Sequence, residues 1–149
     1  MSTLRITSPS FGNNANIPSK YTCDGEDVNP ALAIENVPTG AGSLALIVDD
    51  PDAPAGTWVH WVLWNIPAGT REIKEHSVPA GASQGLTDFR KRAYGGPCPP
   101  SGTHRYFFKL YALDAVLSLG PDTTKAALER AMKGHIVAQA ETVGLYRRQ

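Results

Sequence analysis

The 149-residue sequence lacks a dominant charge, and this limits the partners that the protein can have. Its 14 Lys and Arg residues balance 14 Asp and Glu residues, and no basic cluster stands out except Arg147-Arg148. Proteins that bind nucleic acids gather Lys and Arg on one surface to contact the phosphate backbone. The composition therefore argues against a nucleic-acid partner, and any bound anion must be held by a local site.

Long apolar runs are also missing. No uninterrupted apolar stretch reaches the roughly 20 residues that a membrane-spanning helix needs, and the first residues lack the apolar core of a secretory signal. We therefore expect a soluble, cytoplasmic protein without a transmembrane segment. The length suits one domain covering residues 1–149.

Cysteine is scarce, because Cys23 and Cys98 are the only two. Neither belongs to a CxxC pair or to the four-ligand spacing of a structural zinc site. Two reduced thiols are the default expectation. A single disulfide is the alternative if the folded loops meet.

Common catalytic motifs are absent as well. His60, His104 and Asp50 are conceivable metal ligands, but no HExxH pair or other tight histidine spacing joins them. Ser101 precedes His104 by three residues without the GxSxG turn of a hydrolase nucleophile. We therefore predict a protein that is not an enzyme and that has no metal site, no catalytic residues and no cofactor.

Turns between short apolar runs are abundant. Gly (14 residues) and Pro (12 residues) together make 26 of the 149 residues, in clusters spread along the chain. This pattern is typical of an all-β fold, and we expect a two-sheet antiparallel β-sandwich with one or two short helices. The expected strands are residues 4–7, 31–37, 43–49, 57–66 and 104–113.

The helical signal is confined to residues 122–133, where apolar side chains recur at helical spacing. Pro121 precedes this segment and Gly134 follows it, as expected for the start and stop of a helix. Residues 135–146 fit a helix by composition and a strand by alternation. We predict a strand there.

Side chains on a strand alternate between two faces, and this alternation indicates where the polar residues point. Asp50 continues the interior face that carries Val48. On the next strand, His60 falls on the same face as Trp58 and Trp64. Both polar residues are therefore expected to face apolar surroundings.

His104 begins a third run, on the same face as Tyr106 and Phe108. Both histidines thus enter apolar strands near the point where Asp50 leaves its strand. We expect a pocket that gathers them at one end of the sandwich.

Chemically, two histidines, a tyrosine and nearby aspartates suit an anionic group such as phosphate. Imidazolium and phenol groups donate hydrogen bonds, while Asp50 and Asp52 would hold the imidazoles in place from a loop stiffened by prolines. Taken singly, each residue also has an ordinary explanation. A histidine can be a satisfied core residue, an aspartate can form a turn, and the tryptophans can belong to the core.

Five short motifs together resemble the phosphatidylethanolamine-binding protein family, which includes the Raf kinase inhibitor proteins, and most of all its bacterial and archaeal branch. They are YTCDG (21–25), DPDAP (50–54), Trp58-x-His60, GPCPP (96–100) and GTHRY (102–106). The resemblance implies a β-sandwich with a small anion pocket near one end. The ligand-binding residues that it implies are Asp50, Asp52, Pro54, Trp58, His60, Gly96, Cys98, Pro99, His104 and Tyr106.

Three functional hypotheses follow. We favour a non-catalytic binding protein for small anionic or phosphorylated ligands, including phosphate and phospholipid headgroups, with peripheral lipid contact possible. An inhibitor or scaffold that binds a protein kinase or protease through its loops is the first alternative. A metal-assisted hydrolase is the second and the less favoured one.

Overall fold

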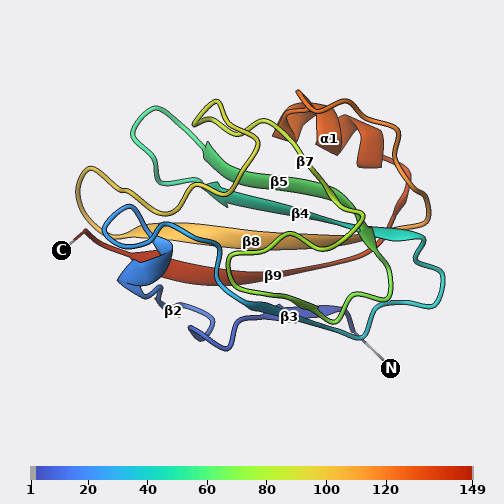
Figure 1. Ribbon diagram of the computed structural model, residues 1–149, viewed down its shortest axis with the longest axis horizontal. Coiled ribbons are helices and arrows are strands. Elements are labelled where there is room, and N and C mark those ends of the chain that lie inside the picture. The colour runs from blue at the N-terminus through green and yellow to red at the C-terminus, as the bar shows by residue number, and fades with distance from the viewer. Residues whose placement is uncertain (1–2, 149) are drawn as a thin grey trace.

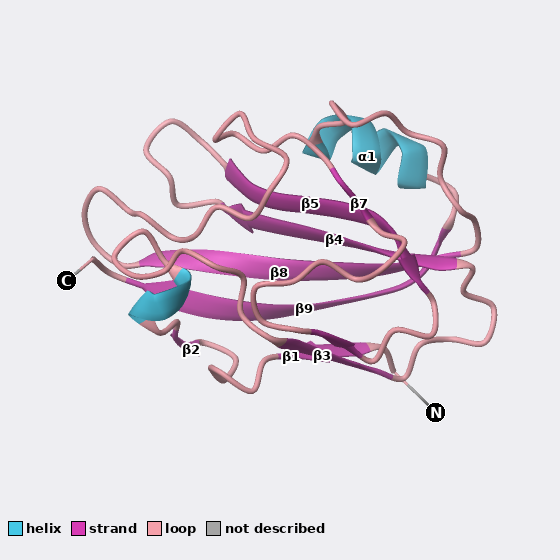
Figure 2. Cartoon of the chain, in the orientation of Figure 1, coloured by secondary structure: helices cyan, strands magenta, loops and turns pink. Residues whose placement is uncertain are grey.

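The computed structural model describes residues 3–148, in which the regular secondary structure is mainly strand (Figures 1 and 2). The helical elements of this part are a 3-10 turn at Ser19–Tyr21 and the α-helix α1 at Lys125–Met132. The strands are β1 (Arg5–Thr7), β2 (Ala15–Asn16), β3 (Leu32–Glu35), β4 (Ser43–Asp50), β5 (Trp58–Pro67), β6 (Glu72–Ile73), β7 (Ser83–Gln84), β8 (His104–Leu113) and β9 (Ile136–Tyr146).

The strands form two sheets. The larger sheet has the order β2-β9-β8-β4-β5-β7 and the smaller one the order β1-β3-β6. Neighbouring strands are antiparallel except for the short parallel pair of β2 and β9. This arrangement confirms the predicted two-sheet β-sandwich.

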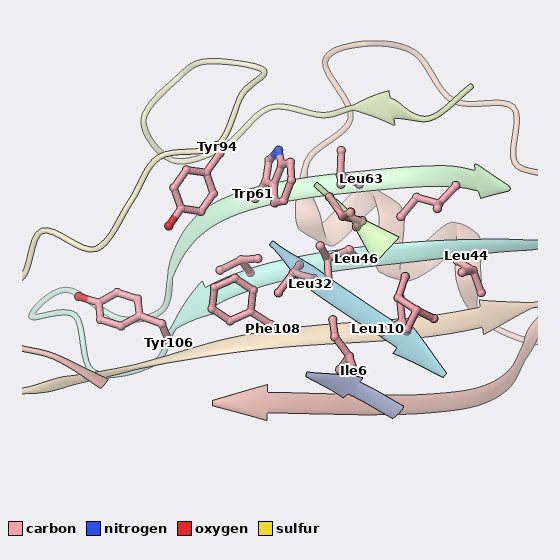
Figure 3. Packing of buried hydrophobic residues seen from close by; sticks show 14 of the residues in the cluster. Ile6, Leu32, Leu44, Leu46, Trp61, Leu63, Tyr94, Tyr106, Phe108 and Leu110 are labelled. Atoms are coloured by element: carbon pink, nitrogen blue, oxygen red, sulfur yellow. The ribbon is translucent and has the colours of Figure 1, made fainter. Parts of the chain in front are cut away.

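The main core lies between the two sheets (Figure 3). Leu32 from β3 packs there with Leu46 from β4, Leu63 from β5 and Phe108 from β8. A second apolar cluster lies on the other face of the large sheet, beneath α1. Because both faces are covered, all eight residues of β4 are buried.

Most elements predicted from the sequence are present with small changes in their bounds. The strand at 104–113 is found with these bounds, and the ambiguous tail is a strand, as predicted. The short strands β2, β6 and β7 were not predicted, because two residues carry no periodic signal.

The α-helix α1 is shorter than the predicted 122–133. It begins after Thr124, whose side-chain oxygen accepts a hydrogen bond from the backbone N–H of Ala127, and it ends at Met132. Gly134 then takes a φ of 85°, which glycine adopts at little cost. Within residues 3–148, the structure contains no helix with the length and apolar character needed to cross a bilayer.

The alternation along β4 is as predicted. Val48 faces the main core, while Asp49 faces the opposite side of the sheet. There Asp49 accepts a hydrogen bond from Lys109 at 3.0 Å and forms an ion pair with Lys125 at 2.8 Å. The neighbouring Asp50 points to the same side as Val48, and the two adjacent carboxylates therefore have separate partners.

The alternation along β5 is interrupted by a β-bulge. Val48 pairs with Trp61 and Asp49 pairs with Val59, so His60 is an extra residue on the β5 side. Beyond the bulge, Trp64 packs in the cluster under α1, whereas His60 contacts aromatic rings on the other face. The prediction that these two residues share a face is therefore wrong.

Cys23 and Cys98 form a disulfide, with their Cα atoms 5.4 Å apart. The default expectation of two reduced thiols is thus wrong. Spacing in the sequence did not reveal the bond, because 75 positions separate the two residues. A backbone hydrogen bond of 3.1 Å from Cys23 N to Pro97 O holds the same two segments together.

Candidate functional site

A cavity of about 310 Å³ opens at the end of the sheet where β4 ends and β5 and β8 begin. Figure 1 shows the loop that leaves β4 and the loop that leads into β8 at the same end of the molecule. We call this space the end cavity. Its lining residues are Asp50, Ala53, Pro54, Trp58, His60, Phe89, Cys98, Pro99, Pro100, His104 and Tyr106.

The loop after β4 forms one wall of the end cavity, and Asp50 and Asp52 hold this loop in shape. Asp50 Oδ1 accepts a hydrogen bond from the backbone N–H of Asp52 at 2.7 Å, and this contact closes a tight turn. Asp52 in turn accepts three hydrogen bonds of 2.9 Å from Arg105, one from its backbone and two from its guanidinium group. These contacts lower the pKa of Asp52 to about 2.

Asp52 therefore ties the loop to the start of β8 and lies outside the cavity lining. The sequence placed it among the ligand-binding residues because it belongs to the DPDAP motif. Its position fits a structural role, since a stiff loop needs little further ordering when a ligand binds.

Asp50 and His104 form a buried pair on the cavity wall. His104 Nδ1 donates to Asp50 Oδ2 at 2.7 Å, and only 9% of the His104 side chain and 4% of the Asp50 side chain are exposed. The carboxylate fixes the ring orientation and the position of the hydrogen on Nδ1, so Nε2 faces away from Asp50. A protonated His104 would present its Nε2–H as a second donor.

His60 enters the cavity from the β5 bulge, and its ring is buried. Its Nδ1 lies 2.7 Å from the carbonyl oxygen of Gly95. Because a carbonyl only accepts, Nδ1 must carry the hydrogen, and in the neutral ring Nε2 is then an acceptor. Burial lowers the pKa of His60, and this effect outweighs the hydrogen bond to Gly95 and the nearby negative charge of Asp50.

The sequence-based hypothesis treated His60 as a cationic donor to an anion. The Nδ1–H of His60 is already bound to Gly95, and burial of the ring disfavours the charged form that would supply a second donor. The side chains packed around it are rings, with Phe89 and Tyr106 each at a centroid distance of 5.2 Å. His60 therefore offers the cavity an acceptor in an apolar setting.

Tyr106 lies between the two histidines. Its ring is perpendicular to that of His60 and stacked on that of His104, at centroid distances of 5.2 and 6.4 Å. Its hydroxyl oxygen is buried and has no hydrogen-bond partner among the described residues. Burial, together with the charge of Asp50, raises the pKa of Tyr106, so the hydroxyl keeps its proton and can donate it in a hydrogen bond.

Comparison with known proteins identifies the family of the chain. The profile of the family described as "Phosphatidylethanolamine-binding protein" matches residues 7–147. The chain belongs to the phosphatidylethanolamine-binding protein family. The resemblance read from the five sequence motifs is thus confirmed.

Relatives of this phosphatidylethanolamine-binding protein family member cover almost the whole chain. A UPF0098 protein of Methanothermobacter thermautotrophicus is 48% identical over 97% of this chain and 99% of its own length. A UPF0098 protein of Chlamydia pneumoniae is 44% identical over 96% of this chain and 98% of its own.

Two solved structures of the family share the fold. A Chlamydia trachomatis homologue of phosphatidylethanolamine-binding protein superposes with a TM-score of 0.96 at 40% identity, covering all of both chains. Escherichia coli YbcL, described as a member of the mammalian family, gives 0.92 at 29% identity and covers 99% of this chain and 100% of its own.

Most residues suggested by the family motifs come together in the end cavity, but Gly96 does not line it. The Gly96 N–H donates to Asp27 Oδ1 at 2.7 Å, and an added Cβ would lie 2.3 Å from the Tyr21 carbonyl oxygen. Gly96 thus allows close packing of the loop behind the cavity. Cys98 does line the cavity, and its disulfide anchors that loop to Cys23.

Sequence reasoning missed Phe89, which contacts both Trp58 and His60 at the cavity. The Phe89 side chain is 37% exposed although it is aromatic. A lone aromatic residue in the charged stretch TDFRKR (87–92) was the available signal. Ala53 and Pro100 also line the cavity, and Gly95 holds His60 through its carbonyl group.

Neither a metal-ligand cluster nor the other large cavity offers a better candidate site. Residues 3–148 contain no group of three or more His, Cys, Asp or Glu side chains arranged to hold a metal ion. A larger cavity of about 840 Å³ borders α1 and β5 and shares Trp58 with the end cavity. The buried His60, His104 and Tyr106 belong to the end cavity, which is therefore the candidate site.

Proposed function

We propose that this protein is a non-catalytic binding protein for small anionic or phosphorylated ligands. One observation carries the proposal: the Tyr106 hydroxyl is buried at the end cavity without a hydrogen-bond partner, beside the buried pair of His104 and Asp50. A buried hydroxyl without a partner costs about 1–3 kcal/mol, and a ligand oxygen that accepts from it would recover this energy. The family name supports a ligand of the phospholipid headgroup class.

The chemistry of the cavity favours binding over catalysis. Cys98 is tied up in a disulfide and therefore offers no thiolate nucleophile. Most other lining residues are apolar, among them Pro54, Trp58 and Phe89. A few polar groups in an apolar cavity are typical of a site that recognises a small molecule.

A titration with inorganic phosphate and O-phosphorylethanolamine tests this proposal. Imidazole signals would be followed by NMR between pH 5 and 8. We expect saturable shifts at His60 and His104, because both rings line the cavity. His76 and His135 lie outside the cavity lining and serve as internal controls. Unmoved signals at His60 and His104 would reject the proposal.

The cellular setting remains a prediction. A cytoplasmic location was expected from the sequence, but a disulfide is typical of oxidising compartments or of hyperthermophiles. A protein kinase or protease partner and peripheral contact with lipids are likewise untested predictions. Capture experiments with and without phosphate would address the protein partner.

A further inference from the structure

The disulfide between Cys23 and Cys98 joins two loops that are held in different ways. The first loop is fixed by its own backbone, because Thr22 N donates to Ser19 O and Gly25 N donates to Thr22 O, both at 3.0 Å. Thr22 is also buried, and its side chain donates to the same Ser19 oxygen at 2.8 Å. The loop that carries Cys23 therefore has a support that does not depend on the disulfide.

In the second loop, the hydrogen bonds stop just before Cys98. Residues 94–97 are buried, and the Gly96 N–H donates to Asp27 Oδ1 at 2.7 Å. Residues 98–103, which we call the tethered loop, form no hydrogen bond with any described residue. Within the described part of the chain, the disulfide is therefore the link that fastens the tethered loop before strand β8 begins.

A reagent in solution can reach this disulfide while the protein stays folded. Both Cys23 and Cys98 are partly exposed, and residues 100–103 of the tethered loop are exposed. A thiolate exchanges with a disulfide where it has access to one of the two sulfurs. Opening the bond breaks no strand pairing, because neither cysteine belongs to a strand. The folded protein thus permits the exchange.

We propose that Cys23 and Cys98 form a redox modification site, at which a dithiol reductant opens the disulfide in the folded protein and releases the tethered loop. One thiolate of the reductant attacks Cys98 Sγ, and the S–S bond breaks with Cys23 leaving as a thiolate that takes up a proton. The second thiol of the reductant loses its proton and attacks the reductant sulfur of the mixed disulfide, so that Cys98 leaves and is protonated in turn. Two electrons and two protons pass to the protein, and a small disulfide such as oxidised glutathione reverses the exchange.

Release of the tethered loop also changes the end cavity, because Cys98, Pro99 and Pro100 belong to its lining. A wall that is ordered before binding needs no further ordering when a ligand enters. In the reduced protein, this wall must be ordered on binding, and the affinity falls. This consequence rests on the proposed anion-binding function, whereas the opening of the bond and the release of the loop do not.

Reduction kinetics test whether the bond opens in the folded state. Free thiols would be counted after addition of dithiothreitol at several concentrations, at constant pH, without urea and with 1 M urea. We expect a rate proportional to the dithiothreitol concentration and nearly equal in the two solutions. Exchange that requires global unfolding would accelerate roughly fivefold or more in 1 M urea, because urea favours the unfolded chain. That acceleration would overturn the proposal.

Backbone order parameters from NMR relaxation test the release of the loop. We expect the values of Ser101, Gly102 and Thr103 to fall on reduction to below about 0.6, the range of flexible backbone. Gly25 and Gly96 should not change, because their N–H groups are hydrogen-bonded at 3.0 and 2.7 Å.

The variant Cys98→Ser should give the same loop mobility without any added thiol. Equal order parameters of the tethered loop in the oxidised and reduced wild-type protein would overturn the proposal. Loss of the folded spectrum on reduction of the wild type would also overturn it, because the bond would then support the whole fold. The wild-type measurement is decisive by itself if the variant does not fold.

Calorimetry with methyl phosphate, a small phosphomonoester, measures the consequence for the end cavity. We expect the affinity of the reduced protein to be about tenfold lower, since its cavity wall is no longer preorganised. Reoxidation should restore the affinity, which a damaged protein would not show. Ser101→Ala is a matched control in the tethered loop, and it should keep the wild-type exchange rate and affinity because this side chain has no hydrogen bond with the described residues.

The outcomes separate this inference from the proposed function. Equal affinities of the oxidised and reduced protein for methyl phosphate would overturn the effect on the end cavity. If the oxidised protein does not bind methyl phosphate, the proposed function fails. The reduction kinetics and the order parameters then still decide whether Cys23 and Cys98 form a redox site.

Discussion

Burial distinguishes the two histidine–aspartate pairs of this protein, and replacing each aspartate measures its effect. His104 Nδ1 lies 2.7 Å from Asp50 in a pair whose side chains are 9% and 4% exposed. His135 Nδ1 lies 2.8 Å from Asp114 in a pair whose side chains are 46% and 48% exposed. The contacts are chemically alike, so Asp114→Ala is a matched control for Asp50→Ala.

The two variants should lose different amounts of stability, because water can replace the lost partner of the exposed His135 but not that of the buried His104. Breaking a buried ion pair by removing one partner costs about 3–5 kcal/mol. Asp50→Ala also removes the acceptor for the backbone N–H of Asp52, which lies 2.7 Å from Asp50 Oδ1. An exposed pair contributes about 0–1 kcal/mol, so Asp114→Ala should change stability little.

Urea unfolding at pH 6 measures the free energy of unfolding of Asp50→Ala and of Asp114→Ala. A domain of this size has a stability of about 5–15 kcal/mol, so Asp50→Ala should remain folded in water unless the wild-type protein is at the low end. Its affinity for methyl phosphate should fall at least tenfold, while Asp114→Ala binds like the wild type. Similar stability losses in the two variants would refute the argument from burial.

Two further predictions concern stability. Replacing both Cys23 and Cys98 with Ser should lower the free energy of unfolding by about 4.5 kcal/mol, because the disulfide closes a loop spanning 75 positions and so restricts the unfolded chain. If a reductant leaves the stability of the wild-type protein unchanged, the disulfide is not present. Burial lowers the pKa of His60 in the folded state, so the unfolded chain takes up more protons below pH 6.5. Above pH 6.5 the free energy of unfolding is therefore unaffected by His60, and below pH 6.5 it falls by up to about 1.4 kcal/mol per pH unit. Measured by urea unfolding, the free energy of unfolding of His60→Gln should depend less on pH in this range.

The order and type of the main elements followed from local sequence patterns. The strand at β8 was predicted with its observed bounds, because alternation and turn residues are properties of neighbouring positions. The same holds for the interior position of Asp50, which simple alternation along β4 placed correctly. Alternation also placed His104 near a pocket at this end of the sandwich, with Tyr106 on the same face of its strand, and both residues line the cavity.

Alternation was not sufficient for His60. It predicted a face shared with Trp64, but the bulge opposite β4 places the two residues on different sides of the sheet. A bulge depends on the pairing of two strands, and the sequence of one strand does not reveal it. The role of His60 changed as well, because the Gly95 carbonyl group fixes its Nδ1–H.

By itself, the sequence determined the β-rich fold, the helix near residue 125, the family and most of the residues that line the cavity. The fold and the helix follow from side-chain periodicity and turn chemistry, which act locally along the chain, whereas the family and most of the lining residues follow from the resemblance of five short motifs. Only the tertiary structure decided that Cys23 and Cys98 are bonded, that Asp52 pairs with Arg105, and that His60 donates its Nδ1–H to Gly95. Each of these depends on a contact between segments at least 35 positions apart, and such distances are set by the packing of the whole chain.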